Sequence, residues 1–220
     1  MGGQARLTIA ELLGGYAIGV FPMAEGRDDP ELFFVDPATR GIIPLEAPAL
    51  PRRLGRTVRA DRFEVRIDSA FPAILDACAA PGGRDREDTW INPEIRRLYL
   101  ELNAAGFAHS IECWQNGALA GGLYGVALGG AFFGESMVSF VRDASKVALV
   151  HLIARLKTGG FSLLDVQFLT SHLSNLGAVE IDREDYRRRL HLAVVQDADF
   201  GRMPYASDGA SAWQAITQAS

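Results

Sequence analysis

Cysteine is scarce in this sequence. Only Cys78 and Cys113 occur among its 220 residues, too few for a disulfide framework or a four-ligand zinc site of the usual spacing. Neither cysteine adjoins a basic residue, so covalent thiol catalysis has no support. We expect no metal ion, no cofactor and a reducing cytoplasm as the location. The four histidines show no metal-ligand spacing and no evident carboxylate partner: His109, His151, His172 and His191.

Long apolar runs are also missing. The first twenty residues contain Arg6 and Glu11 and no apolar core of the signal-peptide kind, and glycines and polar residues interrupt the longest uncharged stretches elsewhere. We therefore expect neither export nor membrane insertion. With 220 residues and 48% hydrophobic content, the chain is long enough to bury a core as one compact unit or two small ones.

The sequence has no basic surplus. Its net charge of −5 argues against a protein that coats nucleic acid indiscriminately, because such binding requires a broadly positive surface. One basic face is still compatible with this charge, although arginine clusters are more often ordinary solvated surface. The clusters are Arg52, Arg53, Arg56 and Arg59; Arg84 and Arg86; Arg96 and Arg97; and Arg187, Arg188 and Arg189.

The local patterns divide the chain into three parts. Residues 1–60 predict a small N-terminal α/β domain that contains a helix at about 9–16, a strand at 41–44 and a connector at 51–59. Residues 61–195 have a more regular pattern, which predicts a larger domain. Residues 196–220 form a polar, turn-rich C-terminal tail to which we assign no function.

The larger domain is predicted to begin with a strand at 63–67 and helices at 69–79 and 93–105. An antiparallel meander then spans 108–139, because Asn116-Gly117 and Gly129-Gly130 are strong two-residue hairpin signals.

After the meander, Asp143 is expected to cap a helix that Gly159-Gly160 ends. A strand at 161–167, a short helix to 176 and a basic helix from about 183 follow. The sequence thus predicts an α+β fold.

This order of elements resembles the coenzyme A-dependent N-acyltransferase (GNAT) fold. Enzymes with that fold hold the pyrophosphate of coenzyme A in an Arg/Gln-x-x-Gly-x-Gly/Ala loop at the start of the helix, where glycine permits close backbone approach. The corresponding segment here, residues 141–146, is VRDASK and has no glycine. A coenzyme A donor is therefore disfavoured.

Several separate motifs occur in order between about residues 8 and 190. They are Tyr16-x-x-Gly19-x-Phe21-Pro22-Met23, Thr89-Trp90-Ile91, Gly106-x-Ala108-His109-Ser110, Gly125-Val126-Ala127, Phe133-Gly134-Glu135-Ser136-Met137, Ala144-Ser145-Lys146, Leu164-Asp165-Val166-Gln167, His172-Leu173 and Leu176-Gly177-Ala178. In this order they resemble the leucyl/phenylalanyl-tRNA–protein transferase family. The departures are Phe33-Phe34 in place of a Trp-containing pair, Val166 in place of cysteine, and Val138 in place of phenylalanine.

The resemblance implies an aminoacyltransferase. Such an enzyme moves Leu or Phe, with Met as a further candidate, from aminoacyl-tRNA to the N-terminal Arg or Lys of acceptor proteins and so marks them for N-end rule degradation. The donor ester is already activated, which fits the absence of an ATP-binding loop in the sequence.

Three polar residues are candidates for the chemistry. Asp165 and Gln167 alternate on one predicted strand, so both side chains are expected on the same face, where the resemblance implies that they orient the attacking amine. Glu135 lies in an apolar stretch, where a carboxylate needs hydrogen-bond partners. The resemblance implies that it positions the aminoacyl ester or its amine. The alternatives are a solvated strand end for the pair and an edge salt bridge for Glu135.

The resemblance also implies the substrate contacts. An apolar pocket for the leucyl or phenylalanyl side chain is expected at Leu123, Phe132, Met137 and Leu164, with Trp90 at its rim. Tyr16, Phe33 and Phe34 are candidates to stack the terminal adenosine. Taken alone, all of these residues are more often core. The basic residues expected to follow the tRNA phosphates are Arg52, Arg53, Arg56, Arg84 and Arg86.

Two other functions compete with this interpretation. One is a coenzyme A-dependent N-acyltransferase of the same fold, and the other is a non-catalytic tRNA-binding module that delivers charged tRNA to another protein. Only the aminoacyltransferase predicts ATP-independent transfer from a tRNA donor to a peptide.

Overall fold

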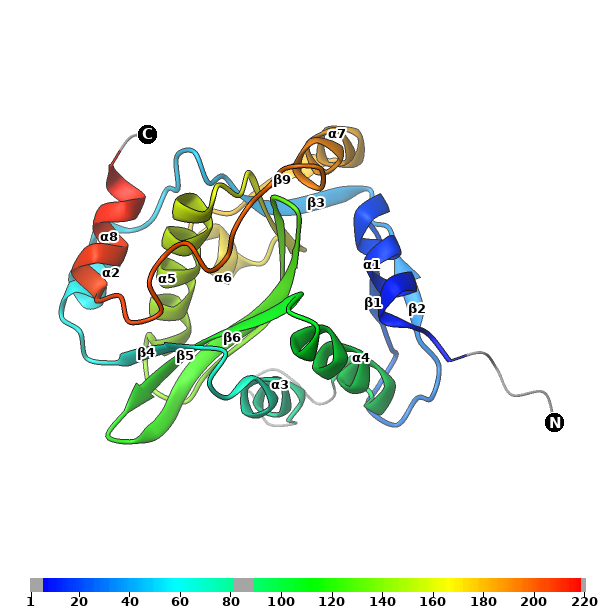
Figure 1. Cartoon of the computed structure of the whole chain (residues 1–220), viewed down its shortest axis with the longest axis horizontal. Coiled ribbons are helices and arrows are strands. Elements are labelled where there is room, and N and C mark those ends of the chain that lie inside the picture. The colour runs from blue at the N-terminus through cyan, green and yellow to red at the C-terminus, as the bar shows by residue number, and fades with distance from the viewer. Residues whose placement is uncertain (1–5, 81–88, 219–220) are drawn as a thin grey trace.

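The structure is a computed structural model that describes residues 6–80 and 89–218. The predicted phosphate contacts Arg84 and Arg86 lie outside the described residues. The fold is α+β, as predicted: a seven-stranded mixed sheet has helices on both faces, and a two-stranded sheet lies beside it (Figure 1).

The antiparallel meander supplies the three longest strands of the large sheet. Its strands are β5 (Ala108–Gln115), β6 (Ala118–Leu128) and β7 (Ala131–Ser139), and the predicted hairpin turn between the first two has positive φ at both Asn116 and Gly117. The complete strand order is β4-β5-β6-β7-β8-β3-β9, where β4 is Glu64–Ile67, β8 is Leu163–Gln167, β3 is Thr39–Ile43 and β9 is Val179–Asp182.

One pair of strands in this sheet is parallel, and it is short. Helix α5 (Ala144–Gly159) connects β7 to β8, which pair only from Ala131↔Leu163 to Phe133↔Asp165. Beyond Phe133, β7 continues along β6, whereas β8 continues along β3. The two strands therefore separate in the middle of the sheet, and this separation creates the site described below.

The first 60 residues contribute to the same sheet. Strand β3 lies between β8 and β9, so residues from the predicted N-terminal domain pair directly with the predicted larger domain. The predicted connector at 51–59 is instead helix α2 (Arg52–Arg59), in which Leu54 and Val58 are buried. The helix packs on α5 and on α8 (Gly209–Thr217).

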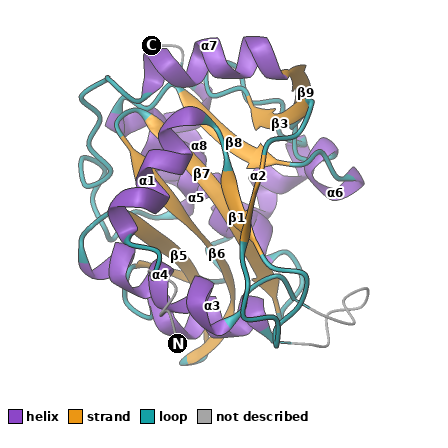
Figure 2. Cartoon of the chain, turned by 90° about the vertical axis from the view of Figure 1, so that its right-hand side faces the viewer, coloured by secondary structure: helices purple, strands orange, loops and turns teal. Residues whose placement is uncertain are grey.

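The helices form two layers. On one face of the sheet lie α1, α3, α4 and α7, and on the other lie α2, α5 and α8 (Figure 1). In the turned view, α1, α3 and α4 lie in front of the strands, while α7 crosses the top (Figure 2). The remaining bounds are α1 Ile9–Ile18, α3 Phe71–Ala79, α4 Pro93–Ala104, α6 Ser171–Ser174, α7 Arg183–Ala193, β1 Phe21–Met23 and β2 Phe33–Val35.

Of the two predicted ends of α5, the C-terminal one is confirmed and the side-chain cap at the N-terminal one is not. Gly160 ends the helix in the left-handed conformation, as expected. Asp143 precedes the helix but does not cap it, because its φ is 69° and its carboxylate binds the Lys146 ammonium at 2.7 Å. Along the described residues, no helix has the length and apolar character needed to cross a membrane.

The C-terminal segment is packed against the sheet rather than extended as a tail. The Phe200 ring stacks on His109 with ring centroids 4.0 Å apart. The guanidinium of Arg155, on α5, is buried and donates hydrogen bonds to the carbonyls of Phe200, Met203 and Pro204. These bonds hold the segment that leads into α8.

We predict that Arg155→Met lowers the free energy of unfolding by about 2–4 kcal/mol, because three carbonyls of this segment lose their donor. Denaturant unfolding measures the effect. Arg202→Met, on the exposed side of the same segment, is the matched control and should change stability by less than about 0.5 kcal/mol. Equal stabilities for the two variants would contradict the anchoring role.

Candidate active site

A cavity of about 620 Å³ lies where β7 and β8 separate. Its walls are mainly apolar, and its polar lining includes Glu135 from β7 and Gln167 from β8. The apolar lining comes from both layers of the fold: Phe21, Met23, Trp90, Leu123, Met137, Leu149, Leu152, Leu164, Val166, Phe168 and Leu173.

A β-bulge places Glu135 in this cavity. Tyr124 of β6 pairs with Ser136 and the next residue, Gly125, pairs with Gly134, so Glu135 is the extra, unpaired residue of β7. Gly125 is required at this point, because a Cβ there would lie 2.2 Å from the Phe133 carbonyl oxygen. The bulge therefore depends on a glycine in the opposite strand.

A second irregularity occurs directly across the opening. Asp165 pairs with Ile42 and Gln167 pairs with Gly41, so Val166 is the extra residue of β8. Gln167 itself has a φ of 60°, a conformation that non-glycine residues seldom adopt. Both strands thus leave regular geometry where they line the cavity.

Glu135 is surrounded by two buried phenols. Tyr16 donates to one carboxylate oxygen at 2.7 Å, Tyr99 donates to the other at 2.9 Å, and the two hydroxyl oxygens lie 2.7 Å from each other. Burial raises the pKa of the Glu135 carboxyl to about 7, and the hydrogen bonds from the phenols offset this only partly. The prediction that Glu135 is buried and hydrogen-bonded is confirmed.

A count of protons agrees with this raised pKa. The three oxygen groups make three mutual contacts, but the two phenols supply only two protons. A proton on Glu135 provides the third and completes the ring of hydrogen bonds. Both protonation states of Glu135 are therefore accommodated near neutral pH.

Two hydrogen-bonding atoms in the cavity lining have no partner among the described residues. The side-chain nitrogen of Gln167 is buried and unbonded, as is the hydroxyl of Ser136. Gln167 lies close enough to Glu135 to lower its pKa, although their geometry is not that of a hydrogen bond. Since buried polar groups normally have partners, these two atoms are available to a bound molecule.

Asp165 is fully buried and does not line the cavity. Arg40 forms a two-point ion pair with it, the shortest contact being 2.7 Å, and the Tyr186 hydroxyl donates to it at 2.7 Å. Its other contact is with the backbone N–H of Gln167, at 2.8 Å. Asp165 is therefore engaged in holding its neighbours.

Arg40 connects this pair to the N-terminal segment. It donates to the carbonyl oxygen of Gly19 at 3.0 Å, and its guanidinium lies 4.5 Å from the ring centroids of both Phe21 and Tyr186. Neither Arg40 nor Tyr186 was predicted from the sequence. The one available signal was a charged residue directly before the apolar strand predicted at 41–44.

The structure brings most of the predicted pocket together. Leu123, Met137, Leu164 and Trp90 all line the cavity. Phe132 does not, because it is fully buried on the α5 side of the sheet. There its ring stacks on that of Phe200, with the ring centroids 5.7 Å apart.

The predicted adenosine contacts lie elsewhere. Tyr16 is fully buried beside Glu135, so its ring has no face free for a base. Phe33 and Phe34 are partly exposed on β2, one strand removed from the cavity-lining β1, and they do not line the cavity. The sequence did not single out Phe168, which lines the cavity and is 46% exposed.

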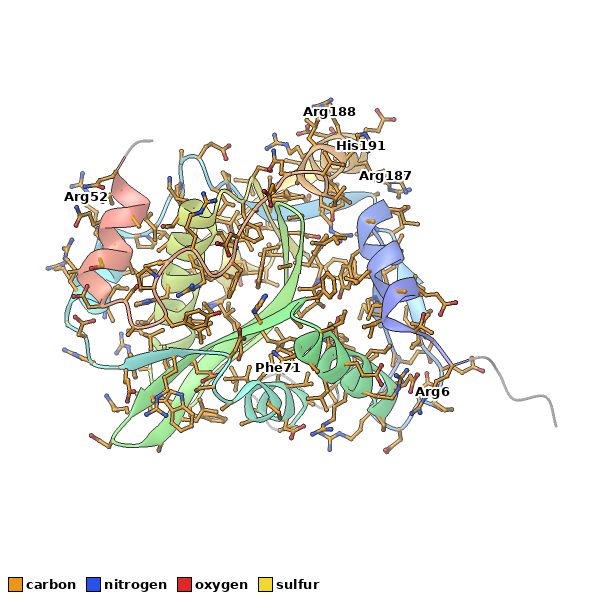
Figure 3. All side chains as sticks on the ribbon, viewed as in Figure 1. Arg6, Arg52, Phe71, Arg187, Arg188 and His191 are labelled. Carbon is orange, nitrogen blue, oxygen red and sulfur yellow. The ribbon has the colours of Figure 1, made fainter. Side chains whose placement is uncertain are left out.

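The arginines of α2 point in different directions. Arg53 and Arg56 line grooves beside α5, whereas Arg52 points outward at the left edge of Figure 3. Arg187 and Arg188 extend from α7, away from α2 (Figure 3). Within the described residues, no three His, Cys, Asp or Glu side chains gather as metal ligands would.

His109 has a carboxylate partner that is not evident in the sequence. Its Nδ1 lies 2.8 Å from an oxygen of Asp68. Asp68 is 41 residues away in the sequence and reaches His109 across paired strands β4 and β5, so spacing could not reveal the contact.

The cavity combines apolar walls, a carboxyl group with a pKa near neutrality and a side-chain amide donor without a partner. These features suit acyl transfer, which requires a proton acceptor and a donor to the developing oxyanion. A family model described as leucyl/phenylalanyl-tRNA protein transferase matches residues 42–191. The chain belongs to the leucyl/phenylalanyl-tRNA–protein transferase family.

Proteins that bear the family's name align with this chain over nearly their full length. The leucyl/phenylalanyl-tRNA–protein transferases of Phenylobacterium zucineum, Maricaulis maris and Caulobacter vibrioides are 59%, 58% and 55% identical to this chain. The alignments cover 99%, 96% and 97% of this chain and 100%, 97% and 98% of the relatives, respectively.

We predict that the Glu135 carboxyl titrates with a pKa of about 7. Tyr16→Phe should raise that pKa further, because it removes a hydrogen bond that stabilises the carboxylate. Carbon-13 NMR of labelled glutamate side chains measures both values. Tyr205→Phe, at an exposed site, is the control and should leave the pKa unchanged. An ordinary glutamate pKa in the unmodified protein would contradict the burial argument.

Proposed function

We propose that the chain transfers Leu or Phe from aminoacyl-tRNA to the N-terminal Arg or Lys of acceptor proteins. The observation that carries this proposal is the apolar cavity at the opening between β7 and β8, with Glu135 and Gln167 in its lining. The relatives' name states a Leu/Phe-tRNA donor and a protein acceptor. We assign the fold to the N-acyltransferase (GNAT) type, whose meander, helix and parallel strand match β5 to β8. Because the proposed donor is charged tRNA, we propose the cytoplasm as the location of the reaction.

The cavity suits an apolar aminoacyl side chain. Leu123 and Leu164 supply aliphatic walls, and Met137 adds a flexible thioether that can adjust to a branched or an aromatic group. This adaptability accounts for acceptance of both Leu and Phe, with Met as a further donor side chain. A charged side chain would be disfavoured, because the apolar walls would remove its hydration without offering it a hydrogen bond.

In our mechanism, the neutral α-amine of the acceptor attacks the ester carbonyl carbon. A C–N bond forms, the carbonyl electron pair moves onto oxygen, and the Glu135 carboxylate accepts a proton from the nitrogen. Collapse of the tetrahedral intermediate breaks the C–O bond, and Glu135 returns the proton to the departing 3′-oxygen. A carboxyl with a pKa of about 7 suits both accepting and releasing that proton.

Gln167 stabilises the charge that develops in this step. Its side-chain nitrogen is buried in the cavity lining without a partner, so it can donate to the oxyanion at no cost to an existing hydrogen bond. The Ser136 hydroxyl is a second free donor beside Glu135. Asp165 acts as a positioning residue, because it accepts a hydrogen bond from the Gln167 backbone N–H and does not itself line the cavity.

The coenzyme A alternative is less well supported. The start of α5, where such enzymes hold a pyrophosphate, has no glycine between residues 141 and 146. Close approach of backbone N–H groups to a pyrophosphate is therefore disfavoured there.

Label transfer tests the proposed function. The protein is incubated with labelled Leu-tRNA or with leucyl-coenzyme A, in each case with peptides that begin with Arg, Lys or Ala and without ATP. We expect label in the Arg and Lys peptides from the tRNA donor. Transfer from the thioester would favour the coenzyme A alternative, and tRNA binding without any transfer would favour a delivery module.

We predict that Glu135→Gln lowers kcat by about a hundredfold and removes the rise of kcat/KM with pH near 7, because the proton acceptor is lost. The sign follows from the carboxylate being the active form, which becomes populated as pH rises. Rates are compared at equal concentrations of neutral acceptor amine, which itself ionises near pH 8. A variant with the original pH profile would assign the proton to another group.

We predict that Tyr186→Phe lowers kcat about three- to tenfold and leaves the KM of the donor and the pH profile unchanged. The variant removes one donor to Asp165 but keeps the ring over Arg40. Asp165→Asn tests the same network more severely, and thermal unfolding must show that it is folded, because Arg40 then loses its buried counterion. A shifted pH profile in Tyr186→Phe would mean that Asp165 itself exchanges the proton.

A further inference from the structure

One edge of β7 is open along part of its length. Strand β6 pairs with β7 up to Ser139, but β8 pairs with the opposite edge only as far as Phe133. Within the part of the chain that the structure describes, no other backbone group bonds to this opposite edge at 135–139. An open edge of this kind presents a row of N–H and C=O groups with which another extended chain can pair.

This open edge lies inside the sheet and lines the cavity. The outer edges of the seven-stranded sheet are β4 and β9, and neither contributes to the cavity lining. Four residues of the open edge do contribute: Glu135, Ser136, Met137 and Ser139. The end of β8 forms the facing wall. The cavity therefore lies between two strands of one sheet, in the position where a further strand can add.

Exposure along β7 gives this position a direction. Glu135 is only 8% exposed, Met137 and Val138 are half-buried, and Ser139 is exposed. Phe140, directly after the strand, is 61% exposed. A chain whose first residue lies at Glu135 therefore leaves the molecule in the direction in which β7 runs. It would be parallel to β7, as β8 is.

The edge and the apolar walls serve different parts of the reaction. The cavity residues Leu123, Leu149 and Leu152 belong to the core cluster on the α5 side of the sheet, and Met137 packs against that cluster. This side suits the leucyl or phenylalanyl side chain of the donor. The open edge offers backbone groups instead, and these suit the main chain of a peptide.

We propose that the N-terminal segment of the acceptor protein binds as an added strand, parallel to β7 along residues 135–139, with its α-amine at Glu135. The proposal rests on the function proposed above, because it takes that amine as the nucleophile. Every residue except proline can make the main-chain hydrogen bonds of a strand on both sides. Binding through the main chain would let one enzyme accept many proteins whose sequences differ after the first residue.

Acceptor peptides with single backbone changes test the added strand. An eight-residue peptide that begins with Arg is compared with analogues in which an ester oxygen replaces one backbone N–H, at its residue 2, 3, 4 or 7. Successive N–H groups of a strand point to opposite edges, so only alternate ones face β7. Among residues 2 to 4, the KM of the peptide should rise about three- to tenfold at alternate positions and stay unchanged between them. The open edge ends at Ser139, so the analogue changed at residue 7 is the control and should match the unmodified peptide.

Amide hydrogen exchange locates the bound peptide on the protein. The measurement uses a saturating concentration of the unmodified peptide and no donor, so no transfer occurs. Exchange in the segment 135–139 should become slower, because the added strand engages N–H groups that are otherwise open. Strand β9, an outer edge of the same sheet, is the matched control, and its exchange should not change.

The other outcomes overturn the assignment. Equal KM values for all analogues, or equal rises at residues 2, 3 and 4, would mean that the main chain is not bound as a strand. Slower exchange in β9 and not in β7 would place the peptide at the outer edge. Slower exchange of 135–139 with an amide-linked leucyl-adenosine, and not with the peptide, would assign the edge to the donor. Absence of transfer from Leu-tRNA to the unmodified peptide would refute the proposed function itself, and this assignment with it.

Discussion

The ion pair between Arg40 and Asp165 joins the parts of the molecule that make the site. Removing two charges from water is unfavourable unless their hydrogen-bonding capacity is filled, and here Arg40, Tyr186 and the Gln167 N–H fill that of Asp165. The partners come from β3, α7 and β8, and Arg40 also reaches the end of α1 through Gly19. One buried pair thus fixes two helices and two strands around the cavity.

The cavity itself follows from an interrupted parallel pairing. A strand that returns beside β7 through α5 could have continued as a regular neighbour, but β8 follows β3 instead after Asp165. Bulges occur at Glu135 and Val166, where the strands diverge. They leave these two residues without a partner residue in the neighbouring strand. Glu135 and Gln167, to which we assign the proposed chemistry, therefore lie on strands of the sheet and still line the cavity.

Patterns in the sequence predicted those structural features that depend on residues close together in the chain. The meander turn at Asn116-Gly117 and the helix end at Gly160 are set by local backbone preferences, and both are confirmed. Helix α2 was missed because its stability comes from packing of Leu54 and Val58 on distant helices. Glu135 was identified, but its partner Tyr16 lies 119 residues away, which no spacing indicates.

The raised pKa of Glu135 has a consequence for stability. Its folded pKa of about 7 exceeds the ordinary 4.5, so the native state binds the proton more tightly and its stability falls as pH rises through that interval. A difference of this size corresponds to roughly 3 kcal/mol, a substantial part of a typical folding free energy. The Arg40–Asp165 network and the two layers of core must offset this cost. The same unfavourable burial of the Glu135 carboxylate supports its proposed role, because it raises the affinity of this group for a proton at neutral pH.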